Sequence, residues 1–280
     1  MDIERITEEN VQEYMDHLSP DMAESMGREY FRGIGLKENG APEGALIWEI
    51  KNAEDEDADR ESELMFLGLA DTADGGELFR VYSDEAEEEE VVRTFFELPD
   101  TDPSLEKLLS GQGFSVKNTE SRDIIVTVGE LSSLDLSKGK VPPYVCGVGE
   151  LMARQYRRGI MNCLFQKRKG LLEDIGELPM SFFDQEVSSC VITDEKVNGF
   201  LLVHQTAGGM LVVELMASFE PDAAVNMAMM MRRSITEAAN LYPADTKVLL
   251  RRHNDQTRQL SARLFPKKKG ETVLAGERKE

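Results

Sequence analysis

The chain has few of the features that mark a membrane, secreted or metal-binding protein. Its 280 residues hold no apolar run near the roughly 18 residues that a membrane helix needs. Residues 1–5 have neither the basic nor the apolar stretch of a secretory signal. The three cysteines, Cys146, Cys163 and Cys190, are widely spaced and match no CxxC metal pattern. We therefore expect a soluble, cytoplasmic protein with reduced thiols, no metal and no membrane partner.

Positive charge is scarce in the first half of the chain. Residues 1–134 contain 11 Lys and Arg against 35 Asp and Glu, a net charge of −24, whereas residues 135–280 contain 21 against 18, a net charge of +3. A phosphate backbone must be met by positive charge, so the composition argues against nucleic acid as a partner. An anionic cofactor would be repelled by the first half and tolerated by the second.

Length and composition predict two domains. A chain of 280 residues is long for one domain and comfortable for two. Residues 135–143 contain two prolines and one glycine, and the sign of the charge changes there. We expect this segment to be a linker between an acidic domain of residues 1–134 and a second domain of residues 144–280.

Apolar spacing and turn residues give an expected order of elements. In the first half, strands are expected at 3–6, 44–50, 63–70, 77–82 and 124–128, and helices after Thr7, at 85–98 and at 105–109. In the second half, a basic helix is expected at about 149–170, strands at 188–193, 197–203, 210–217 and 246–251, and helices at 222–241 and 255–264. The tail from Lys267 is expected to be poorly ordered.

The two halves repeat this order without repeating their residues. Gly44–Trp48 aligns in kind with Gly199–Val203, and Leu78–Tyr82 with Leu211–Leu215. Strands followed by a central helix favour a mixed sheet with helices on both faces. The expected fold class is α/β (an α+β mixed sheet) in two related domains.

This order resembles the GNAT acyltransferase fold. In the second half the resemblance rests on residues 198–203, on 212–219 leading to Pro221, and on Asn254 at the head of the last helix. In the first half it rests on residues 44–47 and on 105–109 with Gly113-Phe114. The resemblance implies two GNAT-like domains in tandem and transfer of an acetyl group from acetyl-CoA to a small-molecule or peptide amine. It leaves open whether the protein forms a homodimer.

The resemblance also implies where acetyl-CoA binds. In that family the cofactor lies along the fourth strand, and its pyrophosphate meets backbone amides of a Q/R-x-x-G-x-G/A loop at a helix N-terminus, where N–H groups and the helix dipole favour anions. Carried onto the second half, this gives the expected cofactor residues Ala217, Phe219, Ala224, Val225, Asn226, Met227 and Asn254.

The sequence departs from the family pattern at several of these positions. Ala224 stands where the family has Arg or Gln, and Met227 and Met229 stand where it has glycines. The first half carries six carboxylates in residues 84–90, which we expect to exclude CoA. The family's tyrosine acid is replaced by Ser261 in one half and by Leu109 in the other. A non-catalytic, GNAT-like binding protein is therefore the alternative to an acyltransferase.

Glu214 is the expected catalytic residue. It interrupts an apolar strand that reads as buried on both faces, where a carboxylate is costly unless it is paired or neutralised. Such a group suits a general base that takes a proton from an amine. The alternative is that Glu214 pairs with an arginine or faces a wet end of the sheet. His204 is either an acid/base group or a hydrogen-bonded structural histidine, and the thiols of Cys163 and Cys190 are expected to be buried and structural.

Overall fold

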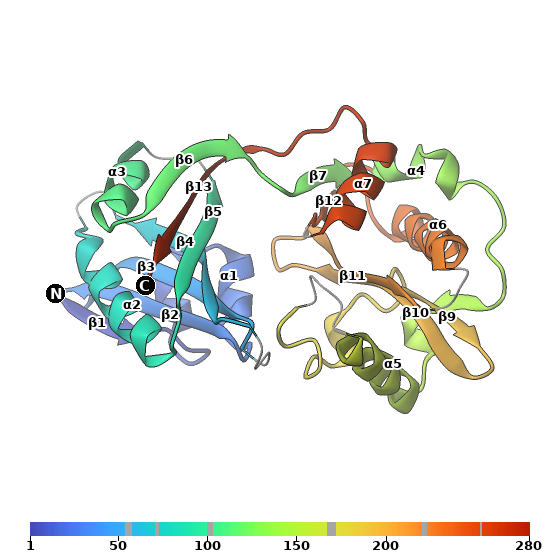
Figure 1. The fold of residues 1–280 in the computed structure, drawn as a ribbon, viewed down its shortest axis with the longest axis horizontal. Helices are drawn as coiled ribbons and strands as arrows, with labels where there is room; N and C mark the ends of the chain where they lie inside the picture. The colour runs from blue at the N-terminus through green and yellow to red at the C-terminus, as the bar shows by residue number, and fades with distance from the viewer. Residues whose placement is uncertain (54–57, 71–72, 100–102, 167–171, 220–222, 253) are drawn as a thin grey trace. The chain divides into compact units, whose positions relative to one another are not determined.

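The computed structural model describes residues 1–53, 58–70, 73–99, 103–166, 172–219, 223–252 and 254–280. They form two compact units, which we call unit 1 (residues 1–121 and 271–280) and unit 2 (residues 122–270) (Figure 1). This division differs from the expected one, because residues 135–143 lie inside unit 2. Arg232 ties them there, donating hydrogen bonds to the carbonyls of Leu136 (3.0 Å) and Lys140 (3.2 Å).

Unit 1 is built on a seven-stranded mixed sheet. Its strands, in spatial order, are β1 (Asp2–Arg5), β2 (Phe31–Glu38), β3 (Ala41–Lys51), β4 (Glu61–Leu69), β5 (Arg93–Pro99), β13 (Thr272–Lys279) and β6 (Ser115–Glu120). Its helices are the 3₁₀ turn η1 (Val11–Tyr14), α1 (Pro20–Ser25), α2 (Gly76–Glu88) and α3 (Pro103–Gly111). Neighbouring strands are antiparallel except β4 and β5, which are parallel.

Unit 2 repeats this plan on a six-stranded sheet. Its strands, in spatial order, are β7 (Ile124–Thr127), β12 (Lys247–Leu250), β11 (Leu211–Ser218), β10 (Lys196–Gln205), β9 (Ser189–Thr193) and β8 (Val145–Gly147). Its helices are α4 (Val128–Ser132), η2 (Asp135–Ser137), η3 (Val148–Glu150), α5 (Ala153–Phe165), η4 (Met180–Phe182), α6 (Ala223–Leu241) and α7 (Asp255–Leu264). Here β11 and β12 form the parallel pair. Among the described residues, no helix is both long enough and apolar enough to cross a membrane.

Each sheet includes one strand that lies outside its own half of the sequence. β7 follows the last strand of the first half and pairs with β12 of unit 2. β13, at the end of the chain, lies between β5 and β6 of unit 1. The expectation of a poorly ordered tail is therefore wrong. Val273, Leu274 and Ala275 are buried in the unit 1 sheet, and this burial orders the segment despite the polar residues around it.

The expected strand at 77–82 and the expected helix at 85–98 are also wrong. Leu78, Phe79, Tyr82 and Ala86 are buried at helical spacing in α2. Residues 93–98 instead bury every second side chain, as a strand with one buried face does. The counterpart of β11 is consequently β4, and the alignment of Leu78–Tyr82 with Leu211–Leu215 fails. The strands expected at 188–193, 197–203, 210–217 and 246–251 are confirmed as β9, β10, β11 and β12.

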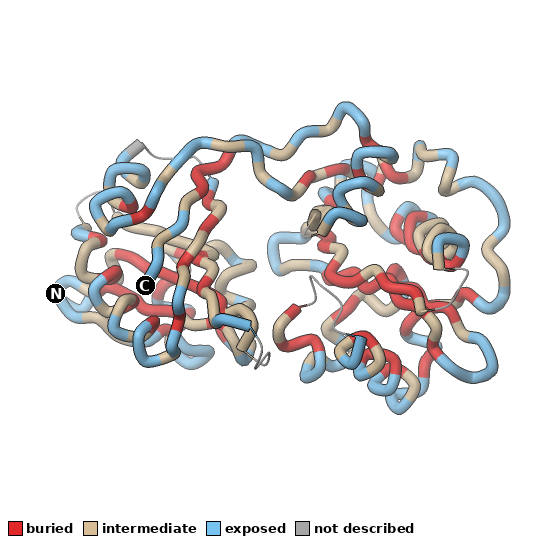
Figure 2. The backbone as a smooth tube through the Cα atoms, viewed as in Figure 1, coloured by how far each residue is buried: buried red, intermediate tan, exposed pale blue. Residues whose placement is uncertain are grey.

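Buried residues gather along the central strands of each unit (Figure 2). In unit 2, β10 is apolar on both faces because helices cover both. Leu201 and Val203 pack in the cluster that contains residues of α6, whereas Phe200 and Leu202 pack in the cluster that contains residues of α5. This two-sided burial explains the continuous apolar run in the sequence, which alternation alone does not predict.

Candidate functional site

The two central strands of unit 2 separate partway along their length. β11 and β12 are paired from Leu211↔Val248 to Val213↔Leu250, where β12 ends. β11 continues to Ser218, with its other edge still paired to β10. Beyond Val213, β12 therefore no longer pairs with this edge of β11.

A β-bulge marks the residue at which the strands separate. β10 pairs Leu202 with Leu215 and Val203 with Val213, so Glu214 is an extra residue in β11. A bulge disrupts the ladder locally, bends the strand and re-aims the side chain of the extra residue. The expected catalytic residue thus occupies the most distorted position of the central strand, directly after the last parallel pair.

The carboxylate of Glu214 is buried and lies between two basic groups. The residue is 6% exposed. Its Oε2 is 3.5 Å from Nε of Arg251, and its Oε1 is 3.8 Å from Nδ1 of His204. The His204 ring stacks on Phe182 with their centroids 4.1 Å apart. Pairing with an arginine, the alternative drawn from the sequence, is confirmed. No local pattern identifies Arg251 as the partner, because the contact depends on the β11–β12 register.

A cavity of about 480 Å³ opens beside the separated strands, bounded by α6 and α7. Small-molecule sites commonly have volumes of about 300–1,000 Å³. Apolar side chains form most of its wall, including Leu201, Val203, Leu211, Ile235, Ala238 and Leu260. Polar residues also line it, among them Glu214, Ser234, Arg251, Asn254, Thr257 and Ser261.

Three of the expected site residues line this cavity: Glu214, Ala217 and Asn254. Asn254 also begins α7, because its side-chain oxygen accepts a hydrogen bond from the N–H of Thr257 at 2.9 Å, as an N-cap residue does. Ser261, which stands where the resemblance places a tyrosine, lines the cavity as well, and its Oγ donates to the carbonyl of Arg258. The cavity is therefore lined by two carboxylates, Glu214 and Asp255, by the guanidinium of Arg251, and by short hydroxyl and amide groups.

The other expected cofactor residues lie outside the cavity wall. Phe219 packs against the cluster of residues on the α5 side, and its N–H donates to the carbonyl of Asn198 at 2.9 Å. Ala224, Val225 and Asn226 lie in the first turn of α6, which begins at Ala223. Pro221, the anchor of the expected phosphate loop, lies outside the described residues.

The assignment of Met227 is corrected by the position of the helix. Its N–H is the fifth counted from Ala223, so within α6 it donates to a carbonyl four residues earlier. Met229 likewise lies inside the helix and not in a loop before it. Neither methionine therefore lies in a loop that precedes the helix, as the family pattern anchored on Pro221 had implied.

Unit 1 carries the same backbone irregularities without a matching side chain. β3 pairs Ile47 with Phe66 and Trp48 with Leu64, so Met65 is the extra residue of β4, in the position of Glu214. The N–H of Ala70 donates to the carbonyl of Glu43, the counterpart of the Phe219–Asn198 bond. These matches align the two units residue by residue and confirm the pairing of Gly44–Trp48 with Gly199–Val203.

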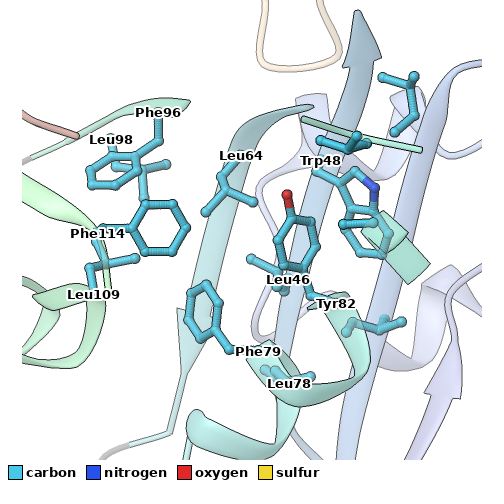
Figure 3. Packing of buried hydrophobic residues seen from close by; sticks show 14 of the residues in the cluster. Leu46, Trp48, Leu64, Leu78, Phe79, Tyr82, Phe96, Leu98, Leu109 and Phe114 are labelled. Carbon is cyan, nitrogen blue, oxygen red and sulfur yellow. The ribbon is translucent and has the colours of Figure 1, made fainter. Parts of the chain in front are cut away.

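The space that is open in unit 2 is filled in unit 1. Trp48 stands in the place of Val203 and Phe96 in the place of Leu250, and both are almost fully buried. Phe114 packs edge-on against Phe96 and Phe79, with ring centroids 5.4 Å and 6.0 Å apart (Figure 3). At this place the two units therefore differ in side-chain size, because unit 1 has large aromatic residues where unit 2 has smaller aliphatic ones.

The carboxylates of unit 1 that lie at a helix start are not the ones singled out in the sequence. Residues 84–88 lie in the last part of α2, away from its N-terminus. At the N-terminus, Oδ1 of Asp74 accepts a hydrogen bond from the N–H of Gly76 at 3.0 Å. An acidic side chain thus occupies the end of the helix that would otherwise attract a phosphate. The segment Asp74-Gly75-Gly76 is the sequence signal for this helix start.

Comparisons with known proteins support this architecture. No family model and no curated protein matches the sequence. Among solved structures, a tandem GNAT protein from the clavulanic acid biosynthesis pathway, solved without AcCoA, is similar over 99% of this chain and 98% of its own, with a TM-score of 0.62 and 11% identity. A Bacteroides thetaiotaomicron VPI-5482 protein of unknown function has a TM-score of 0.58 at 11% identity, over 99% of both chains.

A third solved structure, a putative acetyltransferase from Pyrococcus horikoshii, has a TM-score of 0.55 at 10% identity and covers 100% of this chain and 89% of its own. All three similarities extend over both units. The chain therefore has a tandem GNAT fold, with two mixed sheets of related topology. At 10–11% identity these likenesses concern the fold.

Proposed function

We propose that unit 2 binds an acyl-CoA and transfers its acyl group to an amine. The observation that carries this proposal is the cavity beside the separated ends of β11 and β12, with the bulged Glu214 at its wall. The same place in unit 1 is filled with aromatic side chains, so the proposal assigns one site to each chain.

The residues around the cavity suit an extended, partly apolar ligand with an anionic end. The backbone of residues 215–217 would hold a pantetheine arm by strand-like hydrogen bonds, on the side of β11 where β12 has ended. The N–H groups of Ala223, Ala224 and Val225 would receive the diphosphate at the start of α6. Unit 2 holds 20 Lys and Arg against 17 Asp and Glu, a net charge of +3 that tolerates such a ligand.

Glu214 would act on the acceptor amine. Acetyl-CoA, when bound, supplies the acyl group as a reactive thioester. An amine attacks well only in its neutral form, so the site needs a group that takes its proton, directly or through a water. Glu214, the bulged residue, is a buried carboxylate of the cavity wall, and Arg251 and His204 hold it in place. The cavity would exclude bulk water from the reacting groups through its apolar wall.

A second candidate is a protein that binds an acyl-CoA or a similar ligand without chemistry. The ion pair between Glu214 and Arg251 favours it, because a carboxylate held by a guanidinium is a weaker base. The serine at position 261 favours it too, because Ser261 is a poor substitute for a phenol as a proton donor to the leaving thiolate.

Release of free CoA thiol from acetyl-CoA, measured with a panel of primary amines, separates the two candidates. Transfer predicts amine-dependent release, and Glu214→Gln lowers its rate by about 10²–10⁴-fold, the usual contribution of a general base. The matched control is Glu186→Gln, an exposed carboxylate of the same unit, which leaves the rate unchanged. Binding of acetyl-CoA without release for any amine would favour the second candidate. Release that survives Glu214→Gln would remove the role of Glu214.

A further inference from the structure

Two of the three cysteines face each other at the edge of the unit 2 sheet. β8 is the outermost strand of that sheet and pairs antiparallel with β9. Cys146 of β8 is directly opposite Cys190 of β9 in this register, and their Sγ atoms are 3.4 Å apart. The 44-residue separation in sequence hides this contact, and so we had expected Cys190 to be merely a buried structural thiol.

The backbone at this position suits a disulfide. The N–H of Ile192 donates to the carbonyl of Tyr144, and the N–H of Val148 donates to the carbonyl of Ser188, two residues to either side of the cysteine pair. Cys146 and Cys190 therefore occupy a hydrogen-bonded pair, for which Cα atoms lie about 5.5 Å apart. Disulfides span Cα separations of about 4.4–6.8 Å, and the separation typical of such a pair falls within this range.

The two thiols differ in accessibility and in acidity. Cys146 is partly exposed, whereas Cys190 is fully buried. The hydrogen bond from Cys190 lowers the pKa of the Cys146 thiol, and the guanidinium of Arg233 lowers it further. The same hydrogen bond and burial raise the pKa of Cys190. Reaction with an oxidant depends on the accessible thiolate, so Cys146 would react first and Cys190 second.

We propose that Cys146 and Cys190 form a redox-reversible modification site that reacts with low-molecular-weight disulfides. The Cys146 thiolate attacks one sulfur of the reagent, forming a mixed disulfide and releasing one thiolate. Cys190 then loses its proton to solvent and attacks Sγ of Cys146, forming the protein disulfide and releasing the second thiolate. The protein loses two electrons and two protons, and the reagent is reduced to two thiols.

The bond would fasten the edge strand to the sheet. β8 has only one neighbouring strand, and the chain between the two cysteines includes α5 and η4. Closing a loop of this length restricts the unfolded chain and raises stability. The oxidised protein is therefore expected to unfold at a higher temperature than the reduced protein, by a shift that dithiothreitol reverses.

The test treats the native full chain with oxidised glutathione and maps its disulfides by mass spectrometry after alkylation. The expected product is a single Cys146–Cys190 link, with Cys163 alkylated in its reduced form and the rise in melting temperature described above. Cys163→Ala is the matched control and should give the same link. In Cys190→Ala, Cys146 should accumulate as a glutathione mixed disulfide, because no second thiol faces it.

The wild-type map decides the proposal even when a variant folds poorly. A wild-type protein that stops at the mixed disulfide on Cys146, that links either cysteine to Cys163, or that does not react before it unfolds would overturn the proposal. An unchanged melting temperature for a fully formed Cys146–Cys190 link would overturn the proposed stabilisation.

Discussion

The two units share a backbone plan and differ in what fills it. Both have a parallel strand pair that stops partway, and both have a bulged residue at the point of separation, Met65 in unit 1 and Glu214 in unit 2. Unit 1 fills the adjoining space with Trp48, Phe96 and other aromatic rings. Unit 2 leaves a cavity of about 480 Å³ at the same place. Both units keep the same strand irregularities, so these irregularities belong to the fold. Whether a unit has room for a ligand depends instead on the volume of its side chains.

Charge separates the units in the same direction. Unit 1 contains 12 Lys and Arg against 36 Asp and Glu, a net charge of −24, compared with +3 for unit 2. The unit that is filled at the centre also carries the charge that repels an anionic cofactor. Side-chain volume and charge both favour unit 2 over unit 1 for the proposed CoA site.

The largest expected effect comes from removing a buried aromatic ring from the core of unit 1. Phe114→Ala removes a buried ring that packs against Phe79 and Phe96, and should lower the free energy of unfolding of unit 1 by about 3–5 kcal/mol. Leu260→Ala is the control in unit 2. It borders an existing cavity and should therefore cost less. Urea denaturation measures both, and an equal or smaller loss for Phe114→Ala would contradict a filled core in unit 1.

A smaller effect is expected from filling the cavity of unit 2 with a larger side chain. Val203→Trp places in unit 2 the residue that stands at this position in unit 1, and should weaken acetyl-CoA binding at least tenfold, about 1.4 kcal/mol. Val92→Trp, at an exposed position of unit 1, is the control and should leave the dissociation constant unchanged. Calorimetric titration gives both constants. Full affinity in a folded Val203→Trp protein would show that the cavity is not the binding site.

The smallest effect concerns the segment that leads back to unit 1. Glu130 of α4 forms an ion pair with Lys268 at 2.9 Å and accepts a hydrogen bond from the N–H of Thr127. These two contacts lower the pKa of Glu130 below its ordinary 4.5. Because the pKa is lowered on folding, the stabilisation is present above about pH 4.5 and is lost as pH falls through the folded value. For this exposed pair we expect about 0.2–1 kcal/mol.

Lys268→Ala should therefore destabilise unit 2 slightly at pH 7, and by less as the pH falls below 4.5 through the folded pKa of Glu130. Thermal melts of the variant and the wild type across this pH range measure the difference. Lys267→Ala is the neighbouring control, and it should give no pH-dependent change. A loss that is the same at pH 3 and pH 7 would show that Lys268 acts through its contact with the carbonyl of Ile125.

The sequence predicted the tandem fold because local patterns set the strands and helices of unit 2. Apolar runs gave β10 and β11, and the N-cap Asn254 marked the start of α7 correctly. It missed β13, because a short polar tail becomes a strand only when a distant sheet accepts it. It missed α2, because Gly75-Gly76 marks a turn and a helix start equally well.

The candidate site was predictable in its central residue and not in its surroundings. Glu214 is conspicuous as a carboxylate within an apolar strand. Its partners His204 and Arg251, and the facing of Cys146 and Cys190, depend on strand register, which no local pattern contains. The assignment of Met227 to a loop was wrong because the family pattern did not show that this residue lies inside α6.

The most direct test is a calorimetric titration of the full chain with acetyl-CoA that determines how many molecules bind. We predict one molecule per chain, with the heat lost in Val203→Trp. Two molecules per chain would contradict the contrast between a filled and an open unit. The absence of heat at millimolar acetyl-CoA, with the protein shown to be folded, would contradict the proposed site itself.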